Sequence, residues 1–407
     1  GIMTAALPLG AVFGAAASGR LTQKFGRRRI LYAAAIAFFV GSLLAAGAVS
    51  VWMLVAARLL LGVAVGVASM AAPLYIAETA PQKLRGRFVS AFQLAITVGI
   101  LVSYMVGLAF SQDDNWRLMF AAGAIPAVIL FLGLVPLPES PRWFALRGRW
   151  DDARTSLAKV TGDHANVDAA IAEMRAAIES ETGSGTIRDL FRPMMRPALI
   201  VAMGLFFLQQ LSGINAVIYY APQIFREVGF VDQAGQLLAT IGIGVVNVAM
   251  TVVGMWLIER IGRRRLLLIG FGGTTVSLTA LAVTIAPGGG DEWISLAGLA
   301  VFIAAFAVSL GPLPYVLMSE IFPLDVRGAG MSLASITNWG FNFLVVLTFP
   351  TLAAAIGVIG VFGIFAFMCF LGFVFGHLYV PETRGISLEQ IERHIRSGAP
   401  LMQMRPA

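Results

Sequence analysis

Long apolar segments alternate with short polar connections along most of the chain. Eleven of these segments are close to or longer than the length of about 20 residues that a helix needs to cross a bilayer. Nearly every face of each segment is apolar, as expected for helices surrounded by lipid and by one another. The pattern predicts spans at Ile2–Ser18, Ile30–Val49, Val51–Ala77, Phe88–Phe110, Leu118–Leu137, Ala198–Tyr220, Leu237–Ile258, Leu266–Ala286, Trp293–Met318, Met331–Leu352 and Ile356–Val380.

The composition agrees with a protein embedded in the membrane. The 407 residues are 58% hydrophobic and 13% charged, whereas a soluble domain is about half apolar and one quarter charged. The single cysteine, Cys369, excludes a disulfide framework within the chain and a multi-cysteine zinc site. We therefore expect an all-helical integral membrane protein.

The basic residues predict how the spans are oriented. Of the 29 lysines and arginines, 26 lie in alternate connections, whereas the other connections are mainly acidic. Since basic loops remain on the cytoplasmic side, these connections and the tail after Val380 are expected to be cytoplasmic. The net charge of +7 therefore reflects membrane topology and gives no reason to expect a nucleic-acid partner.

One cytoplasmic connection is long enough to contain structure of its own. Within Pro141–Arg196, the segments Trp150–Val160 and Val167–Glu181 have the pattern of short amphipathic helices. This connection separates the first five spans from the last six. The predicted organisation is an N-terminal bundle at 1–140, an intracellular helical linker at 141–196, a C-terminal bundle at 197–380 and a tail at 381–407.

Three groups of residues occur twice, at a nearly constant offset. Gln23–Arg29 resembles Glu259–Arg265, and Glu78 with Arg85-Gly86 resembles Glu320 with Arg327-Gly328. Similarly, Pro138-Glu139-Ser140 resembles Pro381-Glu382-Thr383. Such a repeat indicates two duplicated halves. Because the second half has six spans and the first has five, we expect one further span before Gly1 in the intact protein.

The most polar part of any span is Gln209–Tyr220, which contains two glutamines, an asparagine and two tyrosines. Amide and phenol groups in hydrocarbon need partners, so they usually face a bundle interior or a water-filled cavity. On a continuous helix, Gln209, Tyr219 and Tyr220 would share one face, and Ser212-Gly213 would loosen the helix. One interpretation is hydrogen bonding between helices. The number of polar groups instead favours a binding site for a neutral ligand with many hydroxyl groups.

Taken together, these motifs resemble the sugar porter family of the major facilitator superfamily along essentially the whole chain. The resemblance rests on Gly19–Arg29, Arg58, Glu78, Arg85-Gly86, Pro138–Arg142, Gln209–Tyr220, Gly311-Pro312, Glu320, Arg327-Gly328 and Pro381–Gly385. It implies two pseudo-symmetric helix bundles around a central sugar site, with the second family helix at Ile2–Ser18.

The resemblance also implies the residues of the sugar site. The expected substrate-binding residues are Gln93, Gln209, Gln210, Asn215, Tyr219, Tyr220, Asn247, Gly311, Tyr315, Asn338 and Trp339. Tyr315 departs from the family, which mostly has tryptophan there, and its hydroxyl alters the pocket.

Acidic and basic residues near the cytoplasmic ends of the spans form a second expected group. In the family they latch the two halves in one conformation, although arginines at these positions can also serve only to orient the spans. The expected latch residues are Arg27, Arg28, Glu78, Arg85, Glu139, Arg142, Glu259, Arg263, Arg264, Glu320, Arg327 and Glu382.

The expected coupling residue is Arg58. It lies inside a span, where a charge must extend to the membrane surface or find a partner. In proton–sugar symporters of the family, the matching arginine acts with an aspartate of the first helix.

The predicted function is transport of a monosaccharide or related polyol across the cell membrane by alternating access. Proton symport is the first choice, and facilitated diffusion and a transporter-like sugar sensor are the alternatives. A further alternative is that the chain is inactive without a first helix. We expect no enzyme activity, cofactor or metal, because the three histidines lack ligand spacing and no phosphate-binding loop is present. The expected partners are the sugar, protons and lipid, and the protein is expected to work as a monomer.

Overall fold

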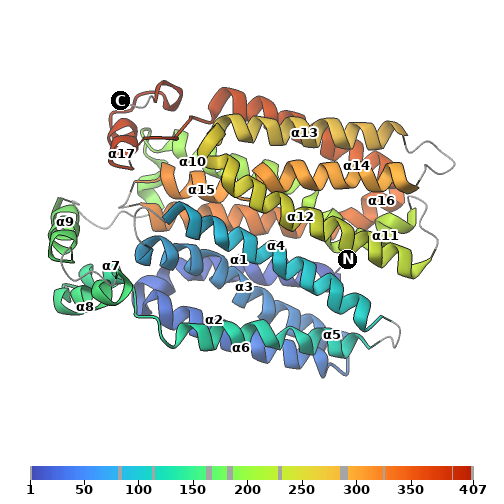
Figure 1. Cartoon of the computed structure of the whole chain (residues 1–407), viewed down its shortest axis with the longest axis horizontal. Coiled ribbons are helices and arrows are strands. Elements are labelled where there is room, and N and C mark those ends of the chain that lie inside the picture. Colours follow the sequence, from blue (N-terminus) through green and yellow to red (C-terminus); the bar gives the residue numbers. More distant parts are fainter. Residues whose placement is uncertain are drawn as a thin grey trace.

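The computed structural model describes residues 2–80, 85–111, 115–161, 167–180, 187–227, 232–284, 292–323, 326–386 and 388–404. Within these ranges the regular elements are all helices, and most of them run nearly parallel along the long axis of the molecule (Figure 1). This arrangement is the helical bundle that the apolar segments predict.

The first half contributes five crossings. They are α1 (Ile2–Phe25), α2 (Arg27–Ala46), α3 (Val51–Thr79), α4 (Arg85–Ala109) and the pair α5 (Trp116–Ala122) and α6 (Ala124–Leu134). The last two elements form one 19-residue span that is interrupted at Gly123.

The second half contains longer and more interrupted helices. They are α10 (Arg196–Leu211), α11 (Ile214–Glu227), α12 (Gln233–Ile261), α13 (Arg263–Thr284), α14 (Glu292–Ala305), the π-helical turn η2 (Phe306–Leu310), α15 (Leu313–Ile321) and α16 (Arg327–Tyr379). The 53 residues of α16 include Gly357 with φ 73°, a backbone conformation that ends one crossing and begins the next. With α16 divided there, the ten apolar helical segments among the described residues give the eleven predicted crossings.

The remaining helices gather at one end of the bundle. These are α7 (Pro141–Ala145), α8 (Trp150–Thr161), α9 (Val167–Ser180), η1 (Ile187–Phe191), α17 (Leu388–Arg396) and η3 (Leu401–Gln403). In Figure 1, α7, α8, α9 and α17 all lie at the left, and the N-terminus lies toward the right. The two amphipathic helices expected in the long connection are therefore confirmed as α8 and α9. We call this end, which carries most of the basic residues, the basic end.

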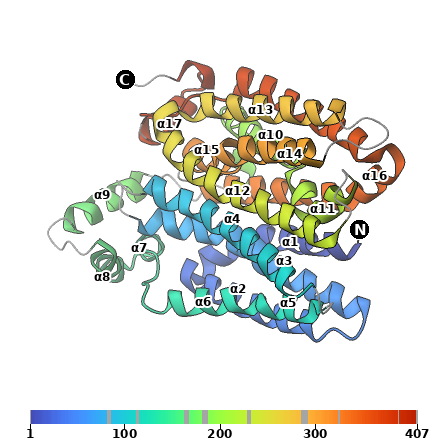
Figure 2. The same cartoon turned by 45° about the vertical axis from the view of Figure 1, so that its right-hand side comes forward.

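The two halves meet along two matching seams. Helix α1 packs on α16, and α4 packs on α12. By the repeat offset, α12 corresponds to α1, and the first part of α16 corresponds to α4. The contact between α1 and α16 is therefore equivalent to the contact between α12 and α4. Figures 1 and 2 show the two halves, coloured blue to teal and yellow-green to red, on either side of these seams.

Large apolar side chains remain exposed around the outside of both halves. Trp52 is 77% exposed, Val276 is 70% exposed and Trp293 is 66% exposed. Apolar surface on this scale needs an apolar environment to cover it. The exterior of the bundle therefore fits a lipid bilayer, as the span lengths already indicate.

Candidate functional site

A cavity of about 400 Å³ lies between the two halves. It is lined by residues from α2, α3, α4 and α6 on one side and from α10, α11, α12, η2, α15 and α16 on the other. The lining residues include no aspartate, glutamate, lysine, arginine or histidine. Because a buried charge without an opposite charge is costly, such a cavity suits an uncharged ligand.

The most polar part of the wall is formed at the interruption between α10 and α11. Gly213 adopts φ 84°, and an added Cβ would lie only 2.1 Å from the Phe365 ring, so glycine is required there. The interruption places Gln209 and Gln210 at the end of α10 and Asn215 at the start of α11. Both glutamines are 4% exposed and line the cavity.

Four of the polar side chains form a directional chain of hydrogen bonds. Asn215 Nδ2 donates to Gln210 Oε1, and Gln210 Nε2 donates to Asn338 Oδ1. Asn338 Nδ2 then donates to the Tyr315 hydroxyl at 3.3 Å. Each amide is oriented by the next, which leaves the Tyr315 hydroxyl proton and Asn215 Oδ1 available to a ligand.

Other amides in the cavity have unused hydrogen-bonding capacity. Among the described residues, the side chains of Gln93 and Asn247 make no hydrogen bond, and Asn342 Oδ1 is buried without a partner. The Gln93 amide faces Gly311, where an added Cβ would lie 3.2 Å from Gln93 Nε2. Since buried polar groups are normally paired, these three amides are suited to bind a ligand with hydroxyl groups.

Most of the predicted substrate-binding residues meet at this cavity. Nine of the eleven line it: Gln93, Gln209, Gln210, Asn215, Asn247, Gly311, Tyr315, Asn338 and Trp339. The prediction missed Asn342, which also lines the cavity. The sequence feature that could have identified Asn342 is its position four residues after Asn338, which places both side chains on one face of a helix.

Tyr219 and Tyr220 are not among the lining residues. The Tyr220 hydroxyl donates to the Val346 carbonyl at 3.0 Å, and its ring stacks on Phe349 with ring centroids 5.0 Å apart. The Tyr219 hydroxyl lies near the side chain of Asn342. The expectation of one helical face shared with Gln209 was wrong, because the interruption at Ser212-Gly213 changes the helical phase between the glutamine and the tyrosines.

Arg58 lies outside the cavity wall and forms no ion pair among the described residues. Its guanidinium carbon is 5.8 Å from the centroid of the Phe120 ring, and Nε is buried without a partner. The coupling role of Arg58 therefore remains a prediction.

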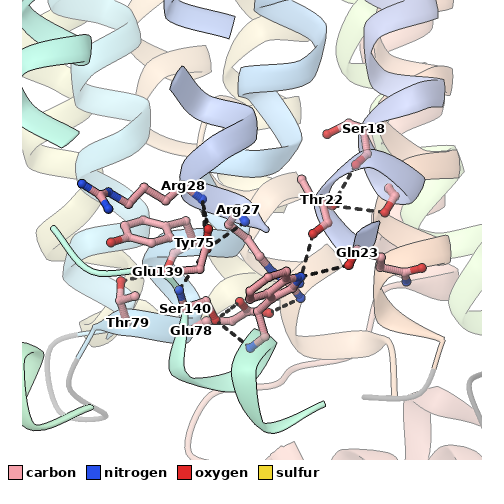
Figure 3. Close-up of polar contacts among 12 residues, drawn as sticks. Ser18, Thr22, Gln23, Arg27, Arg28, Tyr75, Glu78, Thr79, Glu139 and Ser140 are labelled. Carbon is pink, nitrogen blue, oxygen red and sulfur yellow. Dashed lines mark hydrogen bonds and ion pairs between the residues drawn. The ribbon is translucent and has the colours of Figure 1, made fainter. Parts of the chain in front are cut away.

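A second group of polar residues lies at the basic end of the first half (Figure 3). The Glu139 carboxylate accepts hydrogen bonds from the backbone N–H groups of Arg27 at 2.8 Å and Arg28 at 3.0 Å, at the start of α2. Arg27 Nη2 pairs with Glu78 Oε1 at 2.8 Å, and Ser140 Oγ donates to the other oxygen of Glu78. An acidic side chain at a helix N-terminus satisfies free N–H groups and complements the helix dipole. The first turn of α2 is therefore tied to α3 and to the start of α7.

The second half repeats this network. The Glu382 carboxylate accepts from the backbone N–H groups of Arg263 at 2.9 Å and Arg264 at 3.2 Å, at the start of α13. Arg263 Nη2 pairs with Glu320 at 3.0 Å, and Thr383 Oγ1 donates to Glu320 Oε2 at 2.6 Å. The two halves, whose motifs are repeated in the sequence, therefore also form equivalent hydrogen bonds.

The ion pairs formed by Glu78 and Glu320 each lie within one half, and the latch between the halves stays a prediction. Glu259 pairs with Arg263 at 3.6 Å, again within the second half. Arg28, Arg264 and Arg327 donate to the backbone carbonyls of Val135, His377 and Phe322. The Arg85 side chain lies outside the described part of the chain, and Arg142 lies in α7.

The fold and the cavity define a class of membrane transporter: two repeated helix bundles enclosing one central, uncharged site. The chain matches the model of the "Sugar (and other) transporter" family over residues 1–395, and it belongs to that family. The predicted family membership is therefore confirmed, as is the prediction that the protein is a transporter and not an enzyme.

Individual relatives agree with this assignment. The D-xylose transporter of Levilactobacillus brevis is 40% identical over 402 residues, covering 98% of this chain and 87% of the relative. The galactose-proton symporter of Escherichia coli K12 is 37% identical over 406 residues, covering 99% and 87%. The solved structure of the proton:xylose symporter XylE of the major facilitator superfamily, bound to 6-bromo-6-deoxy-D-glucose, superimposes with a TM-score of 0.85 at 32% identity. It covers 96% of this chain and 88% of XylE, so the fold is that of the major facilitator superfamily.

Proposed function

We propose that this transporter moves a neutral monosaccharide or related polyol, binding it in the cavity between the two halves. The observation that carries the proposal is a wall without charged residues in which Gln93, Asn247 and Asn342 have unused hydrogen-bonding groups. Amides can both donate and accept, so they can replace the water around sugar hydroxyls. Polar groups on both sides of one cavity allow each half to bind the same ligand, which alternating access requires.

Proton symport is the proposed mode of energy coupling. The names of the galactose-proton symporter and of the proton:xylose symporter XylE support it. Arg58 is the proposed coupling residue, because a cation in a membrane helix usually marks an ion pathway. Facilitated diffusion is the second candidate, favoured by the lack of an ion-pair partner for Arg58 among the described residues.

The proposed orientation follows the distribution of charge. We place the basic end, with α7–α9 and α17, in the cytoplasm of a cell whose inner membrane the protein spans several times. The protein is proposed to act as a monomer, because both halves of the site belong to one chain. In this scheme the two repeated acid–base networks stabilise the cytoplasmic ends of their own halves in one conformation of the cycle.

The test is uptake of labelled neutral sugars by cells that express the protein, with the external pH recorded at the same time. The proposal predicts saturable uptake of at least one monosaccharide or polyol, accompanied by alkalinisation outside the cell. Uptake without a pH change would favour facilitated diffusion. Absence of uptake for every neutral sugar, with the protein present in the membrane, would refute the proposed function.

A further inference from the structure

Pro222 and Pro350 lie inside membrane helices of the second half, and Pro314 lies in the first turn of α15. Each of these prolines alters the hydrogen bonding of the carbonyl group four residues earlier. Proline has no N–H, so the carbonyl at that position loses its usual helical donor. Pro222, Pro314 and Pro350 remove the donor from the carbonyl groups of Ile218, Leu310 and Val346. A carbonyl in a membrane helix without a donor needs another partner.

In this structure each of the three carbonyl groups accepts a side-chain hydrogen bond. Gln209 Nε2 donates to Leu310 O at 2.6 Å, and the Tyr220 hydroxyl donates to Val346 O at 3.0 Å. Both of these bonds lie within the second half. The third bond, from the Tyr104 hydroxyl to Ile218 O at 3.0 Å, joins α4 of the first half to α11 of the second half.

The position of this third bond relates it to the cavity. Ile218 lines the cavity, as does Ile100, which precedes Tyr104 by one helical turn on α4. Helix α4 begins at the basic end, so Tyr104 lies on the opposite side of the cavity. Its ring packs closely on α12, where a Cβ added to Gly244 would be 3.1 Å from Tyr104 Cδ2.

The acceptor lies where α11 bends. Tyr220, between Ile218 and Pro222, has the non-helical angles φ −115° and ψ 17°. A bend of this kind follows from the clash between a proline ring and the carbonyl four residues earlier. The same bend turns that carbonyl outward from its own helix, where a donor from another helix can reach it.

We propose that Tyr104 is a positioning residue of the transport cycle. Its hydroxyl and the Ile218 carbonyl form a clasp between the halves, which holds the cavity closed at the end away from the basic loops. The clasp breaks when that end opens, and Pro222 keeps the acceptor available. This inference rests on the proposed alternating-access function.

The test measures how often the cavity opens at the end away from the basic loops. In a Cys369→Ser background, Ile96→Cys places one thiol at the cavity wall, and a membrane-impermeant maleimide is added outside the cells. Tyr104→Phe removes the donor, and Pro222→Ala returns an N–H that competes for Ile218 O. A single hydrogen bond between membrane helices corresponds to a shift of about threefold in an equilibrium. Each variant is therefore expected to raise the labelling rate about two- to threefold.

The double variant and a hydroxyl control show whether the effect belongs to the clasp. Once Tyr104→Phe has removed the hydrogen bond, adding Pro222→Ala should change the labelling rate little further. If Pro222→Ala instead loosened α11 in general, the increases in labelling rate from the two substitutions would multiply. Ser103→Ala, which removes an exposed hydroxyl whose hydrogen bond lies within α4, should leave the labelling rate unchanged. Unchanged labelling in both test variants, or multiplied effects in the double variant, would overturn the clasp.

Transport kinetics provide a second measurement on the same variants. A larger open population lowers KM for external sugar, because the binding state is more often available. The same shift lowers kcat, because the closed state that precedes transport is less populated. KM and kcat unchanged from the parent protein would also contradict the clasp. If the parent protein carries no sugar at all, the proposed function fails, while the labelling experiment still tests the clasp by itself.

Discussion

The Glu139 carboxylate accepts a hydrogen bond from the backbone N–H of Arg27 at 2.8 Å, which fixes the first turn of α2 to a residue 112 positions later in the chain. Glu382 does the same for Arg263 in the second half at 2.9 Å. In each half the contact needs a glycine immediately before the arginine. Gly26 has φ 97° and Gly262 has φ 93°, and a side chain at either position would meet the carboxylate.

Gly26→Ala is therefore expected to destabilise the protein strongly. The left-handed backbone alone costs a residue with a side chain about 1–2 kcal/mol. The new Cβ would also lie 2.3 Å from Glu139 Oε2, so the carboxylate would have to leave the helix terminus. The matched control is Gly148→Ala, since Gly148 has φ 71° but no atom within 4 Å of the added Cβ. Thermal unfolding of the purified proteins should show the larger loss for Gly26→Ala; equal losses would contradict the proposed role of the carboxylate contact.

The buried ion pair of the first half gives a second prediction. The side chains of Arg27 and Glu78 are only 6% and 7% exposed, so Glu78→Ala leaves a buried guanidinium without its carboxylate. Breaking a buried pair in this way costs about 3–5 kcal/mol. Arg154→Ala breaks the Arg154–Asp168 pair, whose side chains are 58% and 67% exposed, and should cost less than about 1 kcal/mol. Denaturant unfolding of both variants tests this contrast, and similar losses would show that burial does not determine the strength of these pairs.

The Tyr315 hydroxyl ends the amide chain, so its removal should weaken sugar binding. In Tyr315→Phe, Asn338 Nδ2 loses its acceptor, and the orientation of Gln210 loses support. The loss of one such hydrogen bond is worth about 1 kcal/mol, or about fivefold in Kd. Equilibrium binding of a labelled sugar to purified protein measures the change, and Tyr32→Phe serves as a control remote from the cavity. Unchanged sugar affinity in Tyr315→Phe would show that the orientation of the amide chain does not contribute to sugar binding.

The charge of the ligand is a further prediction. Because no charged residue lines the cavity, a phosphate or carboxylate on the sugar would be buried without an opposite charge. Hexose phosphates and uronic acids should therefore fail to displace a bound neutral sugar at concentrations where the parent sugar displaces it fully. Competition by the charged sugars with equal affinity would contradict the uncharged site.

Much of the architecture could be predicted from the sequence. Segment length predicted the crossings, and the repeated Gly-Arg-Arg and Pro-Glu-Ser/Thr motifs predicted two equivalent halves, because these signals are local or periodic. The cavity itself depends on contacts between helices far apart in the chain. The resemblance to a known family supplied positions such as Gln93 and Asn247, which no local pattern distinguishes from ordinary polar residues of a helix bundle.

The errors have identifiable physical causes. The face that Gln209 was expected to share with Tyr219 and Tyr220 assumed a continuous helix, but Gly213 with φ 84° interrupts it. Asn342 was missed because one amide in a membrane helix commonly serves a helix contact. The latch between the halves stays a prediction, because the sequence shows which residues lie near the membrane surface but not which neighbours they contact.

The most direct test of the account is the affinity of the purified protein for its neutral sugar with and without the Gln210 side-chain amide. Gln210 donates a hydrogen bond to Asn338 and accepts one from Asn215. Gln210→Ala therefore removes two hydrogen bonds from the middle of the amide chain. Kd is expected to rise at least about tenfold, because several buried amides lose orientation and partners at once. A Kd equal to that of the parent protein, with the variant still folded, would contradict the claim that this cavity is the sugar site.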